Sequence, residues 1–181
     1  MKHISILSLL SLLFIFSSCP KNGTNPTTNP QLPPATQTGA NTFGCLVNGK
    51  VWLPNRNNGP SLEVQYYRGL FLLTAANQKD SQSVSWAYQT INALGTYYFK
   101  SAPITGGGSG SEFYDINSNC DFKSNIKDSI NTYITITKLD SLNRIISGTF
   151  NMIYLPAINT MRGTCDTVKI TNGRFDAKYF N

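Results

Sequence analysis

Residues 132–154, TYITITKLDSLNRIISGTFNMIY, decide the fold class of this chain. Apolar and polar side chains alternate on both sides of a polar break at residues 140–143, and a period of two is typical of a strand with one buried face. The break is short and contains Asp, Ser and Asn, residues that favour turns. The stretch therefore predicts two antiparallel strands joined by a tight turn.

The second of these strands contains a glycine on its apolar face. Ile146, Phe150, Met152 and Tyr154 share that face, and Gly148 lies between the first two of them. A glycine inside a strand marks a bulge or a close approach of another backbone. We expect the sheet to coil at Gly148.

The same alternation begins at Thr42 and continues to the end of the chain. In TFGCLVNGKVWLP (42–54), two apolar runs flank Asn48-Gly49, the strongest short-range hairpin signal. SLEVQYY (61–67) resembles an edge strand, and LFLLTAA (70–76) is apolar enough for a central one. The remaining strand-like segments are SVSWAY (83–88), GTYYF (95–99), SEFYDI (111–116), DTVKIT (166–171) and RFDAKYF (174–180).

These segments predict an all-β fold without helices. We expect a single antiparallel domain of about nine or ten strands, either a sandwich or a barrel, with a lipocalin-like barrel as the alternative closure. A turn is expected at Asn172-Gly173, between the last two strands, and GGGSG (106–110) reads as a flexible connector.

Residues 1–18 have the three parts of a secretory signal peptide. Lys2 and His3 form a short basic head, residues 4–16 are an apolar run too short to span a bilayer, and small residues precede Cys19. The sequence FSSC (16–19) resembles a lipobox, the cleavage site of bacterial lipoproteins. This resemblance implies that Cys19 is acylated and anchors the chain in a membrane.

Residues 19–41 predict a disordered tether, and residues 42–181 the folded domain. The stretch PKNGTNPTTNPQLPPATQTGAN (20–41) contains five prolines, no aromatic residue and one charge, so it cannot bury enough surface to fold alone. The formal net charge of the chain is +6, and its basic residues stand apart. This spread excludes the basic patch of a nucleic-acid-binding protein.

The residue inventory limits the chemistry of the domain. The only histidine is His3, in the leader, which excludes histidine-dependent triads and histidine-rich metal sites in the domain. Carboxylates such as Glu63, Glu112, Asp115 and Asp121 would serve a glycosidase only if the fold brought two together across a cleft. We expect no cofactor and no metal.

Three cysteines remain when Cys19 is lipidated. Cys45 lies on an apolar strand face, which suits a buried thiol, whereas Cys120 and Cys165 follow polar, turn-like residues. We expect a disulfide between Cys120 and Cys165, nominally worth about 3 to 4 kcal/mol. Pairing of Cys45 with either of the others, or no disulfide, are the alternatives.

Adjacent tyrosines are the candidate ligand contacts. Neighbours in a strand point to opposite faces, so each of the runs 66–67 and 97–99 should place a tyrosine outside. We select Tyr67, Tyr97 and Tyr98 as possible contacts for a glycan or a protein partner.

Two parts of the chain resemble a known family. ITKLDSLNRIISGTFNMIY (136–154) with CDTVKITNGRFDAKY (165–179), and the opening ANTFGCLVNGKVWLP (40–54), are similar to small lipoproteins of Bacteroidota described as a domain of unknown function. The resemblance implies a β-rich envelope lipoprotein and assigns no catalytic residue.

The sequence thus predicts a lipid-anchored envelope protein of the outer membrane, on its periplasmic side or, as the less favoured alternative, on the cell surface. We expect a non-catalytic module that binds a glycan, a small apolar ligand or an envelope protein. A small carboxylate-dependent hydrolase and a purely structural envelope component are the alternatives.

Overall fold

A computed structural model describes residues 31–99, 109–118, 120–124, 130–156 and 165–181, which contain strands and no α-helix. The strands are β1 (Thr42–Val47), β2 (Lys50–Trp52), β3 (Leu62–Tyr67), β4 (Leu70–Asn77), β5 (Gln82–Tyr88), β6 (Gly95–Tyr98), β7 (Gly110–Asp115), β8 (Cys120–Ser124), β9 (Tyr133–Asp140), β10 (Ile145–Pro156) and β11 (Val168–Lys178). The described residues hold no helix long and apolar enough to cross a membrane. The leader, Cys19 and residues 106–108 lie outside these ranges.

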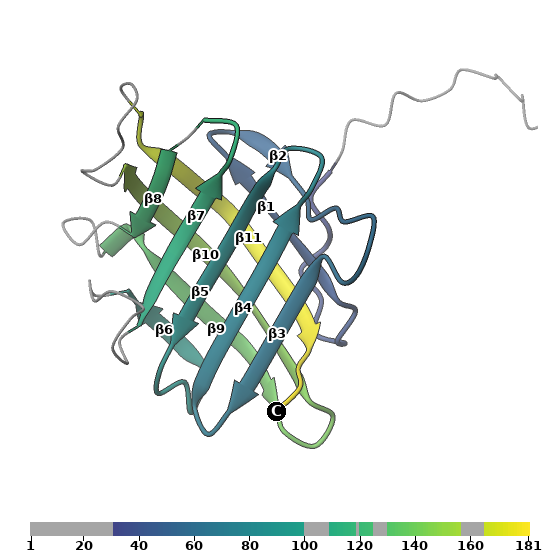
Figure 1. Ribbon diagram of the computed structural model, residues 1–181. Coiled ribbons are helices and arrows are strands. Elements are labelled where there is room, and N and C mark those ends of the chain that lie inside the picture. The colour runs from purple at the N-terminus through teal and green to yellow at the C-terminus, as the bar shows by residue number, and fades with distance from the viewer. Residues whose placement is uncertain (1–30, 100–108, 119, 125–129, 157–164) are drawn as a thin grey trace, which may run out of the picture.

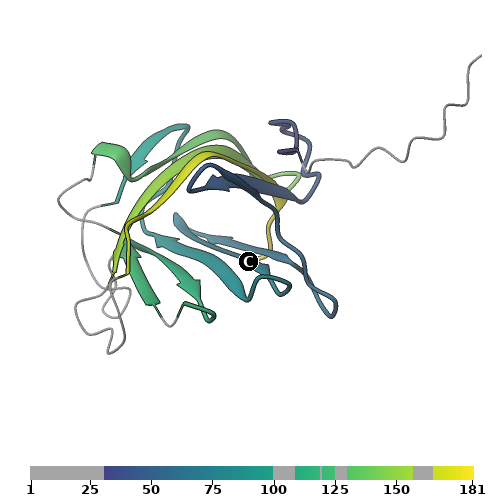
Figure 2. The same ribbon diagram turned by 90° about the horizontal axis from the view of Figure 1, so that it is seen from above.

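The strands form two antiparallel layers packed face to face, which confirms the predicted sandwich. The first layer has the order β3-β4-β5-β7-β8, and the second has β2-β1-β11-β10-β9-β6 (Figure 1). Strand β10 belongs to both, because its first half pairs with β9 and its last residues pair with β8. Figure 2 shows the two layers from above.

The alternative closure, a lipocalin-like barrel, is wrong. Strands β2 and β3, the two ends of the strand order, are not paired with each other. At that side β3 has a single isolated bridge, between Gln65 and Phe180, to the chain that follows β11. One bridge does not continue the ladder, so the layers stay separate there.

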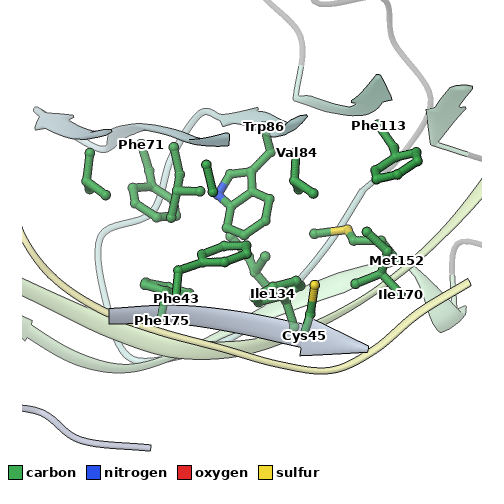
Figure 3. Packing of buried hydrophobic residues seen from close by; sticks show 14 of the residues in the cluster. Phe43, Cys45, Phe71, Val84, Trp86, Phe113, Ile134, Met152, Ile170 and Phe175 are labelled. Atoms are coloured by element: carbon green, nitrogen blue, oxygen red, sulfur yellow. The ribbon is translucent and has the colours of Figure 1, made fainter. Parts of the chain in front are cut away.

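Aromatic side chains fill the space between the layers (Figure 3). Trp86 from the first layer lies with its ring centroid 4.9 Å from Phe150 and 6.0 Å from Phe43 of the second. Cys45 is fully buried among these residues and is a free thiol, so the alternatives that paired it with another cysteine do not hold. Its burial raises the pKa of the thiol to about 12, which keeps it neutral.

Two turn predictions and one bulge prediction are confirmed. Asn48 and Gly49 both have positive φ, 48° and 80°, in the β1–β2 hairpin. Asp140 Oδ1 accepts a hydrogen bond from the Asn143 N–H in the β9–β10 turn, at 2.9 Å. The β9–β10 register shifts at Gly148, where an added Cβ would overlap the Thr135 carbonyl oxygen.

The turn predicted at Asn172-Gly173 is wrong, because β11 continues through it. Asn172 has a φ of 52°, and the register against β10 shifts here, so the dipeptide forms a bulge inside one strand. Asn-Gly accepts the positive φ that either a tight turn or a bulge requires, and a Cβ on Gly173 would overlap the Phe150 ring. The dipeptide alone does not distinguish the two.

The predicted boundary between tether and domain also needs correction. Residues 31–41, here named the N-terminal strap, lie against the outer face of the second layer, and Gly44 of β1 lies under Pro33. The strap is held by Asp176 of β11, which is 1% exposed. The folded part described by the structure therefore starts before Thr42.

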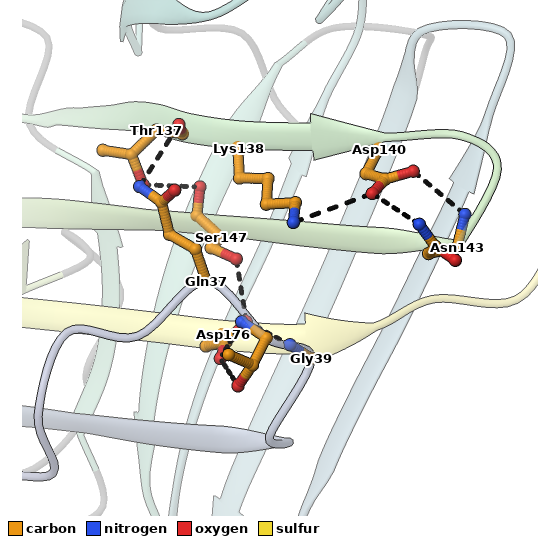
Figure 4. Close-up of polar contacts among 9 residues, drawn as sticks. Gln37, Gly39, Thr137, Lys138, Asp140, Asn143, Ser147 and Asp176 are labelled. Carbon is orange, nitrogen blue, oxygen red and sulfur yellow. Dashed lines mark hydrogen bonds and ion pairs between the residues drawn. The ribbon is translucent and has the colours of Figure 1, made fainter.

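The Asp176 carboxylate is the attachment point of the N-terminal strap (Figure 4). It accepts hydrogen bonds from the hydroxyl groups of Thr36 (2.6 Å) and Ser147 (2.8 Å) and from the backbone N–H groups of Thr38 (2.9 Å), Gly39 (2.8 Å) and Ala40 (3.2 Å). Burial by itself raises the pKa of Asp176, but the hydrogen bonds more than offset it, so the pKa lies well below its usual range. The composition of residues 20–41 predicts no fold for this segment. It carries no information about Asp176, which lies about 140 residues away in the sequence.

Candidate functional site

The candidate site is a groove on the outer face of the first layer, opposite the N-terminal strap. In β4 and β5 the inward residues fill the core, and the alternate residues between them point outward. Most of the outward residues that line the groove are small, namely Thr74, Ala76, Ser83, Ser85 and Ala87, while Leu72 of β4 is the large one among them. Small side chains in the middle of a sheet leave a depression between the longer side chains on either side.

The groove consists of two adjoining depressions that share Thr74. The larger has a volume of about 590 Å³ and is bounded by the loop around Arg56 and, on the other side, by Tyr114 and Ile116. The smaller, of about 320 Å³, lies between Glu63 and Glu112. We name the two depressions together the outer groove.

Register explains how this surface is assembled from distant parts of the chain. Glu63 faces Thr74 across β3–β4, Thr74 faces Ser85 across β4–β5, and Ser85 faces Glu112 across β5–β7. The two glutamates therefore lie three interstrand spacings apart, about 14 Å along the row. Glycosidases place their two carboxyl groups about 5 to 9.5 Å apart, closer than these two backbone positions.

The other carboxylates in this region have local partners. Asp115 Oδ1 accepts hydrogen bonds from the backbone of the following turn, and its Oδ2 accepts one from Gln82 Nε2 at 3.0 Å. Gln82 in turn accepts a bond from Trp52 Nε1 at 2.9 Å, which links the first layer to β2. The side chain of Asp121 lies outside the described residues.

The charges along the outer groove are few and exposed. Arg56 Nη1 lies 3.4 Å from Glu63 Oε1, between the two depressions, and both side chains are exposed. Such a surface pair adds little to stability, because water screens it. With Glu112, the described residues that line the groove include one more acidic than basic side chain.

Hydrogen-bonding groups line the wider depression. Asn58 and Gln78 supply amides, whereas the amides of Asn77 and Gln82 bond within the protein. Tyr114, which is 49% exposed, and Ile116 provide an aromatic and apolar wall. An amide both donates and accepts hydrogen bonds, and a tyrosine ring offers an apolar face with a polar tip. This surface suits a polar, chain-like ligand better than a compact apolar one.

The tyrosines selected from sequence do not form one site. Tyr67 is 54% exposed on the outer face of the first layer, with the Arg68 guanidinium 5.1 Å from its ring centroid, but it lines neither depression. Tyr98 is 45% exposed on β6 of the second layer. Tyr97 points inward and its hydroxyl donates to the Ala93 carbonyl, at 2.8 Å.

Sequence reasoning missed Tyr114, although its signal was present. Tyr114 follows Phe113 in β7, and the rule applied to the runs 66–67 and 97–99 also predicts that one of these two rings points outward. Arg56 could not be found in this way, because it lies in the loop before β3 and reaches the groove through the tertiary fold.

The predicted disulfide remains a prediction. Cys120 is the first residue of β8, but its side chain lies outside the described residues. Cys165 is half-buried against the core just before β11.

Comparisons with family models, with curated proteins and with solved structures return no match. Function is therefore inferred from the geometry of this chain.

Proposed function

We propose that this chain is a lipid-anchored envelope protein, and that its sandwich is a non-catalytic binding module whose outer groove takes a neutral glycan chain. The observation that carries the proposal is the groove itself: an open, elongated depression with a floor of small side chains, amides along it and Tyr114 at its wall. Hydroxyl-rich chains pair with amides, and sugar rings pack on exposed aromatic faces.

The position of the N-terminal strap supports this assignment. The strap leads towards Cys19, so in an anchored chain the second layer is the side attached to the tether. The outer groove lies on the opposite face of the sandwich and is accessible to a ligand from the surroundings. The resemblance to Bacteroidota lipoproteins agrees with this arrangement.

A small apolar ligand and the hydrolase alternative have less support. The space between the layers is occupied by aromatic rings, which leaves no obvious place there for a small apolar ligand (Figure 3). The spacing of Glu63 and Glu112 argues against the hydrolase alternative.

A glycan array tests the groove. The full chain should bind neutral oligosaccharides, and Tyr114→Ala should lower the signal about tenfold by removing the aromatic wall. Tyr67→Ala is the matched control, since Tyr67 is an exposed tyrosine of the same face outside the groove. Absence of binding, or equal loss in both variants, would contradict the proposal.

Membrane fractionation tests the anchor separately. Cys19→Ala should move the chain from the membrane to the soluble fraction and abolish labelling by a fatty-acid analogue, because the acyl chains supply the affinity. Ser18→Ala, which keeps a small residue before the cysteine, should leave both unchanged. Continued labelling of Cys19→Ala would show that the cysteine is not the lipid site.

A further inference from the structure

The outer face of the second layer carries a different group of side chains beside the N-terminal strap. A cavity of about 350 Å³ is lined there by Tyr133, Thr149, Asn151, Asn172 and Arg174, with Ala35 of the strap at its border. Tyr98 adjoins it, its ring centroid 5.8 Å from that of Tyr133. We name these six residues of β6, β9, β10 and β11 the tyrosine face.

Two cross-strand rows build this face. In one row, Arg174 faces Thr149, Thr149 faces Thr135, and Thr135 faces Thr96. In the other, Asn151 faces Tyr133, and Tyr133 faces Tyr98. The first row therefore presents threonine hydroxyl groups and ends at the Arg174 guanidinium. The second row presents tyrosine rings and ends at the Asn151 amide.

The polar groups of the tyrosine face are held in place by one another. Asn151 Nδ2 donates to the Tyr133 hydroxyl at 2.7 Å, and Asn151 Oδ1 accepts from the Asn172 N–H at 3.2 Å. A hydroxyl that accepts a bond keeps its own hydrogen, so Tyr133 retains a donor for a ligand. Tyr98 and Thr149 are exposed beside it.

Arg174 is oriented by two backbone carbonyls. Its Nε and Nη2 donate to the Asn172 carbonyl at 3.3 and 3.4 Å, and its Nη1 donates to the Pro33 carbonyl of the strap at 3.3 Å. A guanidinium has five N–H donors, so these contacts leave two of them. Among the described residues that line the cavity, Arg174 is the charged one and none is a carboxylate.

We propose that the tyrosine face is a second binding site, for an acidic saccharide. The tilted rings of Tyr98 and Tyr133 pack against the sugar, the Tyr133 and Thr149 hydroxyls bond its hydroxyl groups, and Arg174 pairs with its carboxylate. The outer groove has the opposite charge balance, with two glutamates and one arginine. This site lies on the other layer and does not depend on what the outer groove binds.

Calorimetric titration of the full chain with two matched sugars tests this site. An oligogalacturonate should bind about tenfold more tightly than its fully methyl-esterified, neutral form, because only the first offers a free carboxylate to Arg174. Arg174→Gln should remove that preference and leave the affinity for the neutral sugar unchanged. Tyr98→Ala should weaken both sugars, since it removes part of the packing surface.

The control is Tyr114→Ala, an exposed tyrosine of the opposite face. It should leave oligogalacturonate binding unchanged, even if it abolishes neutral-glycan binding in the outer groove, so the two proposals fail separately. Thermal unfolding shows whether Arg174→Gln keeps its fold, and Tyr98→Ala tests the site if it does not. Equal affinities for the two sugars in Tyr114→Ala, where the outer groove no longer contributes, no binding of oligogalacturonate, a preference that survives Arg174→Gln, or a loss of oligogalacturonate binding in Tyr114→Ala would each overturn the proposal.

Discussion

The two outer faces of this sandwich arise from the same strand alternation but end in different states. On the first layer most outward residues of β4 and β5 in the groove are small and uncovered, which makes the outer groove. On the second layer the N-terminal strap covers part of the face, and Asp176, an outward residue of β11, is 1% exposed. Alternation decides which side chains point outward, whereas a distant segment decides which of them stay in contact with water.

Replacing Asp176 should remove the difference between the two faces. Of the substitutions considered, it should cause the largest loss in the free energy of unfolding. Asp176→Ala leaves the donors of Thr36, Ser147 and the strap backbone without their acceptor, so we expect a loss of about 3 kcal/mol in the free energy of unfolding. Urea denaturation measures it. Proteolysis should also begin within residues 31–41.

Asp140→Ala is the matched control for that variant. Asp140 also accepts hydrogen bonds, from the backbone N–H and the side chain of Asn143, but it lies in an exposed turn at the end of β9. Its replacement should have a much smaller effect and leave the strap protected from protease. Equal effects of the two substitutions would contradict the role given to Asp176.

A glycine substitution should disturb one layer and leave the other intact. A Cβ at Gly148 would overlap the Thr135 carbonyl oxygen and contact the Phe175 ring, so Gly148→Ala should cost about 2 kcal/mol of stability. Ser85→Ala, a change of similar size on the open face of the first layer, should be nearly neutral. Chemical denaturation of both variants checks this, and a neutral Gly148→Ala would show that the bulge yields easily.

Low pH should weaken the attachment of the N-terminal strap to the second layer and leave the first layer unaffected. Because the pKa of Asp176 is lower in the folded than in the unfolded chain, its stabilising contribution is complete above the unfolded value of about 3.9 and declines as the pH falls below it. The free energy of unfolding of the wild type should therefore fall more steeply below about pH 4 than that of Asp176→Asn. If the free energy of unfolding fell in parallel with pH in the two proteins, Asp176 would not be the source of the acid sensitivity.

Local patterns predicted the strands and most of their faces. The alternation in residues 132–154 identified β9, β10 and the buried side of β10, because side-chain direction in a strand follows directly from sequence position. Asn48-Gly49 identified the first hairpin because both residues accept the positive φ of a tight turn. Asn172-Gly173 failed because the conformational freedom of this dipeptide serves a bulge as well as a turn.

Features that depend on tertiary contacts could not be predicted. The composition of residues 20–41 shows that they cannot form a core, but not that Asp176 would bind residues 36–40. The outer groove depends on Arg56 of a loop and on the register of four strands, and the tyrosine face joins Tyr98 to Tyr133 across β6 and β9. Of the three tyrosines selected from sequence, only Tyr98 contributes to either site.

Hydrogen–deuterium exchange of the full chain tests the central claim, that Asp176 holds the N-terminal strap on one face and leaves the other face open. The backbone N–H groups of Thr38, Gly39 and Ala40 donate to Asp176, so their peptide should exchange slowly in the wild type and rapidly in Asp176→Asn. Peptides from β4 and β5 should be unchanged by the substitution. Rapid exchange of residues 38–40 in the wild type would contradict the account, because the two faces would then be equally uncovered.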